Sequence, residues 1–346
     1  MKILFSTTTN YNPGDELILK GIENLLSDCK LTYEKYIYDR NPQNFGIFKS
    51  IGEIKLKQLT TEKISYVVFA GTPEWSSEIP SPFDIFRKFE EPRFYPRLLG
   101  LRLTDRINNP LLKFILKNQI RCLFLGVGSS KMPTATGKIS KILKKLTDLF
   151  IVRDIQTYNV FSPFNPIHLT CPAFFAVRHA SLKKDLNNVA FTLQGLNSNR
   201  IRLKVKDFAC SLEQYKKVMK IMGNVDVICH TRKDAEYLYK YIESKHIRVA
   251  DKAGSLINVY SEYDSIFSTR LHGCILANSF GIPCFPLHSS NRMGALDRLL
   301  QSHSSVEPVD WIRNLDVEQE SNRLLKFKAS EKKKYLLLLG DIGIVK

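Results

Sequence analysis

Short apolar runs alternate with helical patterns along the chain, and this alternation occurs in two successive series. The first begins with the strand-like run MKILFS, followed by DELILKGIENLL, whose apolar residues repeat at helical spacing. Further apolar runs at 64–71 and 120–130 each end in glycine and small polar residues, as is typical of strands at the carboxyl edge of a parallel sheet. Such alternation predicts an α/β fold with parallel strands.

The second series extends from VAFTLQG to IPCFPLHSS, after a connection at 171–189 that is proline-containing, then basic, then rich in asparagine. Two such series predict two Rossmann-like domains facing a cleft. We place the first domain at 1–178 and the second at 179–315. The remaining segment, 316–346, is predicted to be helical and to cross back onto the first domain.

Within these series, two segments carry specific secondary-structure predictions. GKISKILKKLTDLF (137–150) predicts a helix, and the IVRD that follows predicts a short strand. In RIRLKVK (200–206), strict alternation predicts a strand with four basic residues on one face. That strand is either an edge protected by charge or a contact for an anionic acceptor.

Composition limits the class of protein. A chain of 346 residues exceeds the size at which one core usually keeps growing, and 44% hydrophobic with 25% charged residues is ordinary for a globular protein. The seven cysteines contain no C-x-x-C pair, which argues against a disulfide framework or a zinc knuckle. The sequence shows neither a secretory signal pattern nor an apolar run long enough to span a membrane, so it predicts a cytoplasmic protein without a metal site.

The formal net charge of +17 indicates an anionic partner, which is nucleic acid, an acidic membrane surface or an anionic substrate. The segment 87–121 carries nine Lys and Arg against three acidic residues, interleaved with Leu, Phe and Ile. This pattern favours peripheral contact with the inner face of a membrane over a nucleic-acid groove. A solvated basic face on ordinary helices is the alternative.

The run STRLHGCILANSFGIP (268–283) places two basic side chains in small, apolar surroundings. SIFST is predicted to be a strand and LHGCILANSF a helix, so Arg270 and His272 lie where the strand ends and the helix begins. Free backbone N–H groups favour an anion there, and a guanidinium binds a carboxylate or phosphate bidentately. Gly273 allows a close approach. The alternative is that Arg270 pairs with an acid such as Asp264 and that His272 only packs.

Five motifs together resemble one known family. YDSIFSTRLHGCILANSFGIPCFPL resembles the C-terminal signature of the polysaccharide pyruvyl transferases, and NYNPGDELILKGI resembles their opening motif. LFLGVGSS, FIVRD and LTCPAF are similar to the family's middle landmarks and occur in the expected order. The resemblance covers residues from about 1 to 300, and its strength lies in the agreement of order and sequence.

The resemblance implies a glycosyltransferase-B-like fold and the transfer of a pyruvyl group from phosphoenolpyruvate to a sugar as a ketal. It implies donor-binding roles for Arg270, Leu271 and His272, and makes Arg153 a second phosphoenolpyruvate arginine. Phosphoenolpyruvate carries a carboxylate and a phosphate, so one arginine from each domain suits it. His272 serves as the acid or as a phosphate ligand. No cofactor is implied beyond phosphoenolpyruvate as co-substrate.

Other candidate residues come from the remaining motifs. Gly14 and Asp15 lie at the mouth of the first predicted helix, where Asp15 acts either as an N-cap or as a contact to a sugar hydroxyl. Glu74 and Trp75 replace a glycine run that the family usually shows, and they are candidates for a hydroxyl base and a sugar-stacking ring.

Three further positions belong to the second half of the chain or to its border. His230 begins a family-like His-x-x-x-Asp arrangement, where the alternative is a structural hydrogen bond. Arg292 precedes a further predicted helix and is another anion candidate. Cys171 stands in CPAF where the family more often has an acid, so any role of that acid is absent here.

Three functions remain open at this point. The first is a pyruvyl transferase that acts on a sugar of a cell-surface polysaccharide or on its lipid-linked precursor. The second is a glycosyltransferase of the same fold class that uses a nucleotide sugar. The third is a non-catalytic protein that binds anionic glycan or nucleic acid through its charge.

Overall fold

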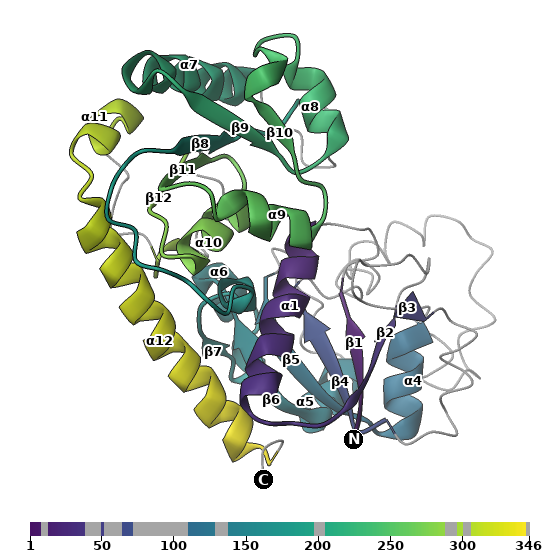
Figure 1. Ribbon diagram of the computed structural model, residues 1–346. Coiled ribbons are helices and arrows are strands. Elements are labelled where there is room, and N and C mark those ends of the chain that lie inside the picture. Colours follow the sequence, from purple (N-terminus) through teal and green to yellow (C-terminus); the bar gives the residue numbers. More distant parts are fainter. Residues whose placement is uncertain are drawn as a thin grey trace, which may run out of the picture. The chain divides into compact units, whose positions relative to one another are not determined.

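The computed structural model (Figure 1) describes most of the chain. The residues described are 1–7, 13–38, 50–51, 64–71, 110–128, 138–196, 205–287, 296–299 and 306–343. By contacts the chain forms two compact units, with unit 1 made of Met1–Asp15, Cys29–Leu169 and Leu338–Lys346, and unit 2 of Glu16–Asp28 and Thr170–Leu337. Residues 16–28 therefore group with unit 2, whereas their position in the sequence assigns them to the first domain.

Unit 1 contains a sheet of seven parallel strands in the order β3-β2-β1-β4-β5-β6-β7. The strands are β1 (Lys2–Ser6), β2 (Glu34–Tyr38), β3 (Ser50–Ile51), β4 (Tyr66–Ala70), β5 (Arg121–Val127), β6 (Thr147–Val152) and β7 (Ile167–His168). The order reverses between β1 and β4, which is where an open α/β sheet binds its ligands, at the carboxyl ends of the strands.

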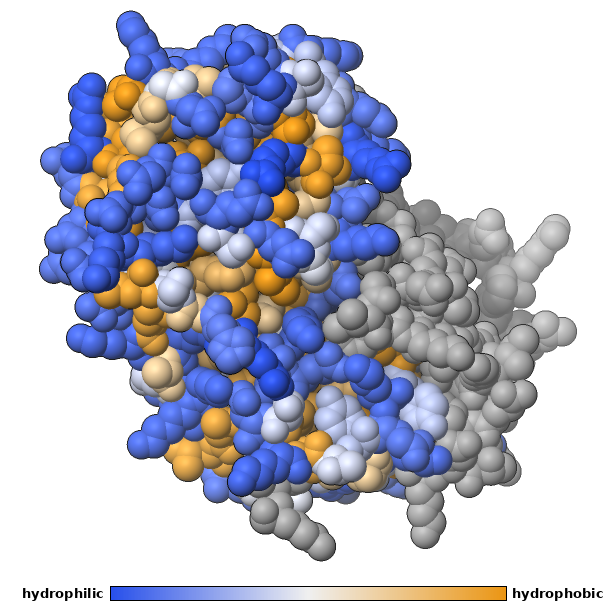
Figure 2. Space-filling view, viewed as in Figure 1, coloured by the Kyte–Doolittle hydropathy of each residue, from blue (hydrophilic) through white to orange (hydrophobic). Residues whose placement is uncertain are grey.

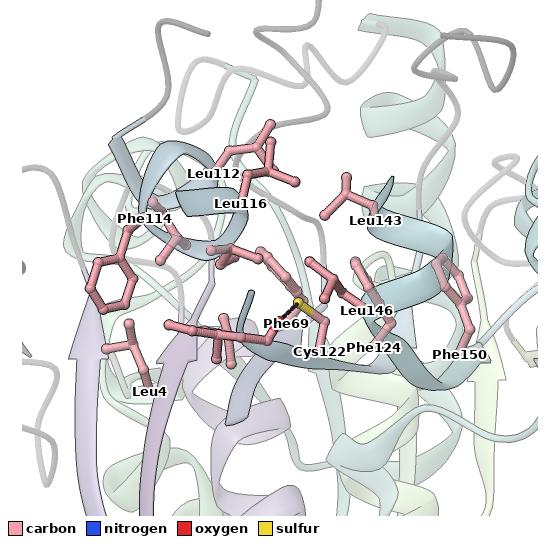
Figure 3. Packing of buried hydrophobic residues seen from close by; sticks show 14 of the residues in the cluster. Leu4, Phe69, Leu112, Phe114, Leu116, Cys122, Phe124, Leu143, Leu146 and Phe150 are labelled. Carbon is pink, nitrogen blue, oxygen red and sulfur yellow. Dashed lines mark hydrogen bonds between the residues drawn. The ribbon is translucent and has the colours of Figure 1, made fainter. Parts of the chain in front are cut away.

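Helices α4 (Pro110–Asn118) and α5 (Lys138–Leu146) cover one face of this sheet, and α6 (Ile155–Val160) follows β6. Three phenylalanines at paired positions of β4, β5 and β6 stack beneath α4 and α5 (Figure 3). Ring centroids lie 4.6 Å apart for Phe69 and Phe124, and 4.5 Å for Phe124 and Phe150. Cross-strand aromatic contacts of this kind fix the register of the buried sheet.

The predicted helix at 137–150 is too long, because β6 already begins at Thr147. The hydroxyl of Thr147 donates to the carbonyl of Leu143 at 2.7 Å, and Thr147 then pairs with Cys122 of β5. The strand formers at 149–152 are buried in the sheet between β5 and β7. Helical spacing alone could not separate the end of the helix from the start of a buried strand.

Unit 2 contains five parallel strands in the order β10-β9-β8-β11-β12. The strands are β8 (Val189–Thr192), β9 (Val225–Cys229), β10 (Ile247–Val249), β11 (Ser265–Ser268) and β12 (Cys284–Pro286). Here too a phenylalanine stack crosses paired strands, with Phe191 and Phe267 at 4.5 Å and Phe267 and Phe285 at 5.8 Å. The order reverses between β8 and β11, which marks the carboxyl ends of these two strands as the expected ligand site.

The helices of unit 2 connect and flank these strands. They include α7 (Val205–Met222), α8 (Arg232–Leu238), α9 (Ala253–Tyr260), α10 (Leu271–Ser279), α11 (Pro308–Arg313) and most of α12 (Val317–Asp341), with the short 3₁₀ helices η6 (Pro172–Phe175) and η7 (Ser244–His246). Val205 and Lys206 belong to α7, so the end of the predicted strand at 200–206 is helical, and residues 200–204 lie outside the described residues. A helix begins there because apolar residues at helical spacing continue through Val218 onto the core.

Helix α1 (Pro13–Asp28) follows β1 in the sequence, yet from Glu16 onwards its contacts are with unit 2. A Cβ atom at Gly21 would lie 1.8 Å from the carbonyl oxygen of Pro172, so only glycine allows η6 to approach the helix. The amide of Asn24 donates to the carbonyls of Phe175 at 2.8 Å and Ala176 at 3.1 Å. These contacts explain why most of α1 groups with unit 2.

Glu331 of α12 binds Thr170, the first residue of the second segment of unit 2. The fully buried carboxylate accepts hydrogen bonds from the Thr170 backbone at 3.0 Å and from its hydroxyl at 2.9 Å. Arg298 and Lys334 donate to its other oxygen at 2.9 and 2.7 Å. Such a carboxylate is fully satisfied by its partners, and it ties three separate segments together.

Candidate functional site

Arg270 lies between β11 and α10, at the carboxyl edge of the unit 2 sheet. Its backbone is extended, with φ −113° and ψ 129°, and it is the N-cap residue of α10. The hydroxyl of Ser268 accepts from the Arg270 backbone N–H at 3.0 Å and donates to its carbonyl at 2.9 Å. The predicted position at the junction of strand and helix is confirmed.

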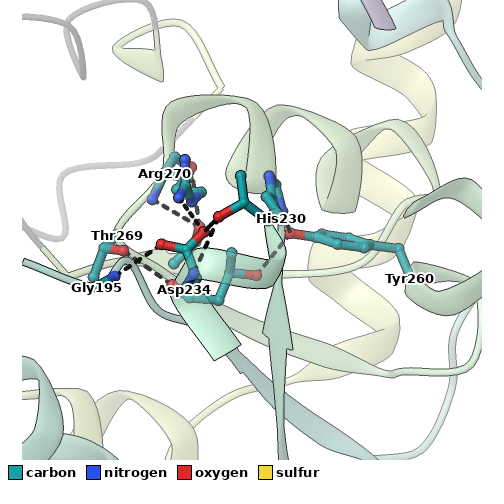
Figure 4. A network of polar contacts seen from close by, with 9 residues as sticks. Gly195, His230, Asp234, Tyr260, Thr269 and Arg270 are labelled. Carbon is teal, nitrogen blue, oxygen red and sulfur yellow. Dashed lines mark hydrogen bonds and ion pairs between the residues drawn. The ribbon is translucent and has the colours of Figure 1, made fainter. Parts of the chain in front are cut away.

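The guanidinium of Arg270 pairs with the carboxylate of Asp234 (Figure 4). The Nη2 of Arg270 lies 2.5 Å from the Oδ2 of Asp234, whose side chain has no exposed surface, while the Arg270 side chain is 13% exposed. The alternative partner Asp264 instead accepts from the backbone N–H groups of Asn187 and Asn188. Arg270 is thus oriented by an acid from α8.

Asp234 also receives bonds from the loops that follow β8 and β9. Its Oδ1 accepts from the backbone N–H of Gly195 at 2.9 Å, and its Oδ2 accepts from the Thr231 hydroxyl at 2.8 Å. Thr231 is the N-cap of α8, and its hydroxyl accepts from the Asp234 N–H at 3.1 Å. One buried carboxylate therefore joins the loops after β8, β9 and β11, on both sides of the reversal in strand order (Figure 4).

His230 lies beside this pair in a chain of buried side chains (Figure 4). Its Nε2 is 2.8 Å from the Tyr260 hydroxyl, which is 2.7 Å from the hydroxyl of Thr192. Burial, with the charges of Arg270 and His272, holds the pKa of His230 well below its usual range, and burial raises the pKa of Tyr260. At neutral pH this is a neutral histidine bonded to a protonated phenol, which fits the structural reading of His230 better than that of a cationic ligand.

His272 and Gly273 form the first turn of α10 together with Leu271. His272 is half-buried, whereas Leu271 is buried in the core. A Cβ atom at Gly273 would lie 2.4 Å from the Ser268 hydroxyl and 2.9 Å from the Tyr260 hydroxyl. The glycine is therefore required by packing inside the protein, and its predicted contact with substrate stays a prediction.

Arg153 of unit 1 occupies the corresponding position on the other sheet, directly after β6. Its side chain is buried, and a Cβ atom at Gly128 would lie 2.2 Å from its Nε. The neighbouring Asp154 is the N-cap of α6 and accepts from the Thr157 N–H at 2.6 Å. Asp154 therefore has an N-cap role, and the predicted role of Arg153 in binding the donor stays a prediction.

The predicted N-cap role of Asp15 is wrong, because α1 already begins at Pro13 and Asp15 is its third residue. Proline suits the first helical position, since its φ is preset and its missing N–H would have no intrahelical partner. Gly14 and Asp15 are both buried at the start of this helix. The next residue, Glu16, accepts from the backbone N–H of Ala253 at 2.8 Å and so caps the distant helix α9.

Glu74, Trp75 and Arg292 lie outside the described residues, so their predicted roles stay predictions. Cys171 is buried at the start of η6. Within the described ranges, no three His, Cys, Asp or Glu side chains gather as a metal site would require. None of the described helices is long and apolar enough to cross a bilayer.

The sequence reasoning missed Tyr260, Thr192 and Gly195, and it did not assign Asp234 to Arg270. The spacing of His230 and Asp234 after a strand was the signal for the acid, since it put both at the carboxyl edge. Nothing in the helical pattern around Tyr260 distinguishes it from a core aromatic residue.

Comparison with protein families identifies the chain. A model of the polysaccharide pyruvyl transferase family matches residues 12–291, which is most of the sequence. The chain belongs to this family. As a member of this family the protein is a transferase that acts in polysaccharide modification. This result does not support the alternative of a non-catalytic binding protein. A search of curated proteins found no significant match.

Solved structures similar to this family member share its fold. HepE from Anabaena, in complex with UDP and glucose, is 10% identical with a TM-score of 0.56, covering 99% of this chain and 100% of that chain. The UDP-GlcNAc 2-epimerase from Neisseria meningitidis, bound to UDP-GlcNAc, is 9% identical with a TM-score of 0.51, covering 96% and 94%. The predicted α/β, glycosyltransferase-B-like fold is confirmed.

Proposed function

We propose that the protein transfers a pyruvyl group from phosphoenolpyruvate to a sugar, forming a cyclic ketal. The observation that carries this proposal is the Arg270 guanidinium, held by Asp234 at the carboxyl edge of the sheet and at the start of α10. The guanidinium presents N–H donors in a planar fork, and one of them binds Asp234. Together with the first turn of the helix, it suits a carboxylate or phosphate.

The overall reaction balances with phosphate as the leaving group. The methylene carbon of phosphoenolpyruvate gains a proton and becomes the methyl group, while the enol carbon forms bonds to two sugar oxygens. The bond between that carbon and the phosphate oxygen breaks. Of the two hydroxyl protons, one balances the proton added to carbon and the other leaves with inorganic phosphate.

Three side chains are assigned to the donor. Arg270 binds an anionic group of phosphoenolpyruvate, and Arg153 is the second donor arginine, supported by its buried position at the end of β6. His272 contacts the phosphate and helps it to leave, supported by its half-buried position in the first turn of α10. A histidine titrates near neutral pH, which suits proton transfer to a leaving group.

The acceptor is proposed to be a sugar of a cell-surface polysaccharide or its lipid-linked precursor, handled by a cytoplasmic protein at the inner face of the membrane. Gly14, Asp15, Glu74 and Trp75 remain acceptor-side candidates. For the membrane contact, the described part of the basic segment includes α4, whose exposed Lys113 and Lys117 accompany no acidic residue in that helix.

Helix α5 adds to this basic surface. It reads KISKILKKL, without an acidic residue, and Lys144 and Lys145 are exposed. Both helices pack their apolar sides on the same face of the sheet (Figure 3). On the face shown in Figure 2 most of the described surface is hydrophilic, with hydrophobic side chains between the polar ones.

A nucleotide-sugar glycosyltransferase is the second candidate function. It is favoured by the fold shared with HepE, which was solved in complex with UDP and glucose. The phosphates of a nucleotide sugar could use the same arginine and helix end. Incubation with each donor separates the two functions, because one releases inorganic phosphate and the other a nucleoside diphosphate.

Titration of phosphoenolpyruvate into the Arg270→Ala variant tests the donor assignment. Charge-assisted hydrogen bonds contribute roughly 1.5–3 kcal/mol each, so affinity should fall by about ten- to a hundredfold. Arg270→Lys keeps the charge beside Asp234 and separates loss of binding from loss of folding. Arg248→Ala, which removes an arginine paired with Glu262, is the matched control. Phosphoenolpyruvate affinity near that of the wild type in Arg270→Ala would refute the assignment.

His272→Ala tests the second role. With phosphoenolpyruvate and an acceptor panel of sugars and lipid-linked oligosaccharides, phosphate release should fall by about a hundredfold or more if His272 transfers the proton. Unchanged turnover would contradict any role in the reaction.

A further inference from the structure

Asp234, the acid that binds Arg270, makes contacts outside its own helix. Asp234 is the third residue of α8, where an acidic side chain commonly bonds back to the backbone N–H of the N-cap. Here its oxygens accept from Gly195 after β8, from Arg270 after β11, and from the hydroxyl of Thr231. The carboxylate therefore connects three loops of the site.

Burial makes this arrangement rigid. The Asp234 side chain has no exposed surface, and both of its oxygens are hydrogen-bonded. The Arg270 side chain has four rotatable bonds, and an arginine without a partner would lose this freedom only when it binds a ligand. A buried ion pair adds little stability over apolar residues of the same size, so its main physical effect is to fix direction.

We propose that Asp234 is a positioning residue for donor binding. It holds the Arg270 guanidinium at the carboxyl edge of the sheet, so that the guanidinium is already oriented when the anionic group of phosphoenolpyruvate binds. This inference rests on the proposed function and adds a second residue to the donor site. Asp234 acts through Arg270 and does not touch the donor. The two residues of the His-x-x-x-Asp arrangement thus have different contacts, since His230 binds Tyr260 and Asp234 binds Arg270.

A double-mutant cycle in the full chain tests this inference. Asp234→Asn keeps the size of the side chain and an acceptor for Gly195, but its amide no longer offers a carboxylate to Arg270. By calorimetry, phosphoenolpyruvate should bind about tenfold or more weakly, and KM should rise more than kcat falls. In the Arg270→Ala background the same substitution should weaken binding by less than about twofold, because the two residues act as a unit.

Two further variants keep the result interpretable. Asp264→Asn alters another acid that binds backbone N–H groups and a lysine, and it should leave phosphoenolpyruvate binding unchanged. If Asp234→Asn fails to fold, Thr231→Val removes one donor to the Asp234 carboxylate, together with the N-cap acceptor of α8, and a folded variant should bind about two- to fivefold more weakly.

The possible outcomes separate the inference from the proposed function. Additive effects of Asp234→Asn and Arg270→Ala, or an Asp234→Asn variant that binds phosphoenolpyruvate like the wild type, would overturn the positioning role alone. Wild-type binding in Arg270→Ala would overturn the donor assignment, and the positioning role with it. A folded Thr231→Val variant with unchanged binding also counts against the positioning role.

Discussion

The Nη2 of Arg270 and the Oδ2 of Asp234 lie 2.5 Å apart, although 36 positions separate the two residues in the chain. The pair joins the loop after β11 to the first turn of α8, which follows β9. Strand β8 lies between β9 and β11 in the sheet, and its following loop contributes the Gly195 N–H to the same carboxylate. A cation is thereby fixed where the strand order reverses.

Acid should destabilise the protein through His230. Burial, with Arg270 and His272, holds its pKa well below the value of 6.5 expected for an unfolded chain. Below pH 6.5 the unfolded state binds a proton that the folded state does not, so stability falls as pH falls, by up to about 1.4 kcal/mol per pH unit. Urea unfolding at several pH values from about 5 up to the unfolded value of 6.5 measures this slope.

The His230→Gln variant should show a smaller slope, by about one proton, because it keeps a polar group near Tyr260 but does not titrate. An identical slope in the wild type and His230→Gln would contradict the assignment of a buried neutral histidine.

Gly273→Ala should destabilise unit 2 and impair the donor site together. The added Cβ would lie 2.4 Å from the Ser268 hydroxyl, which also binds the backbone of Arg270, and 2.9 Å from the Tyr260 hydroxyl. Overpacking of this kind costs about 1–3 kcal/mol, measurable by urea unfolding. Gly254→Ala, in α9 with nothing within 4 Å, should be neutral or stabilising by up to about 1 kcal/mol. Equal stability of the two variants would argue against the packing role.

Glu331→Gln should destabilise the connection between α12 and Thr170. The substitution removes the charge that receives Arg298 and Lys334 in a fully buried position. Because both cations are themselves partly exposed, the expected cost is that of lost charge-assisted hydrogen bonds, about 1–3 kcal/mol. Thermal and urea unfolding measure the loss. The exposed Glu318 lies on the same helix, so Glu318→Gln should change stability by less than about 0.5 kcal/mol. A neutral Glu331→Gln would show that the network does not hold this segment.

Vesicle binding should depend on the lysines of α4 and α5. Each lysine near an anionic surface contributes about 1 kcal/mol, so replacing four of them should weaken binding to phosphatidylglycerol-containing vesicles by at least about tenfold. Sedimentation with phosphatidylcholine vesicles, with and without phosphatidylglycerol, measures this. The residues to replace by Gln are Lys113, Lys117, Lys144 and Lys145.

The control removes the same charge elsewhere, with Gln at the exposed Lys206, Lys216, Lys220 and Lys233. Both variants lower the formal charge from +17 to +13. Equal losses would show that total charge, and not this surface, attracts the vesicles. Binding of double-stranded DNA at the same affinity as the vesicles would argue against the membrane as the partner.

The sequence by itself determined the α/β class, the two parallel sheets and the place of Arg270. Period-2 and helical patterns depend only on neighbours in the chain, and buried parallel strands appear as continuous apolar runs. The boundary at Thr147 was misplaced for the same reason, because a buried strand and the end of a helix share an apolar pattern.

Only the tertiary structure decided which acid binds Arg270, why Gly273 is glycine, and that α1 groups mostly with unit 2. Asp264 is closer to Arg270 in the sequence, but the backbone N–H groups of Asn187 and Asn188 occupy its carboxylate. Asp234 comes from a different strand and helix. Asp234 can reach Arg270 because the parallel strands β9, β8 and β11 are neighbours in the sheet, which brings their carboxyl ends to one edge. Contacts across such distances follow from packing, which local pattern does not contain.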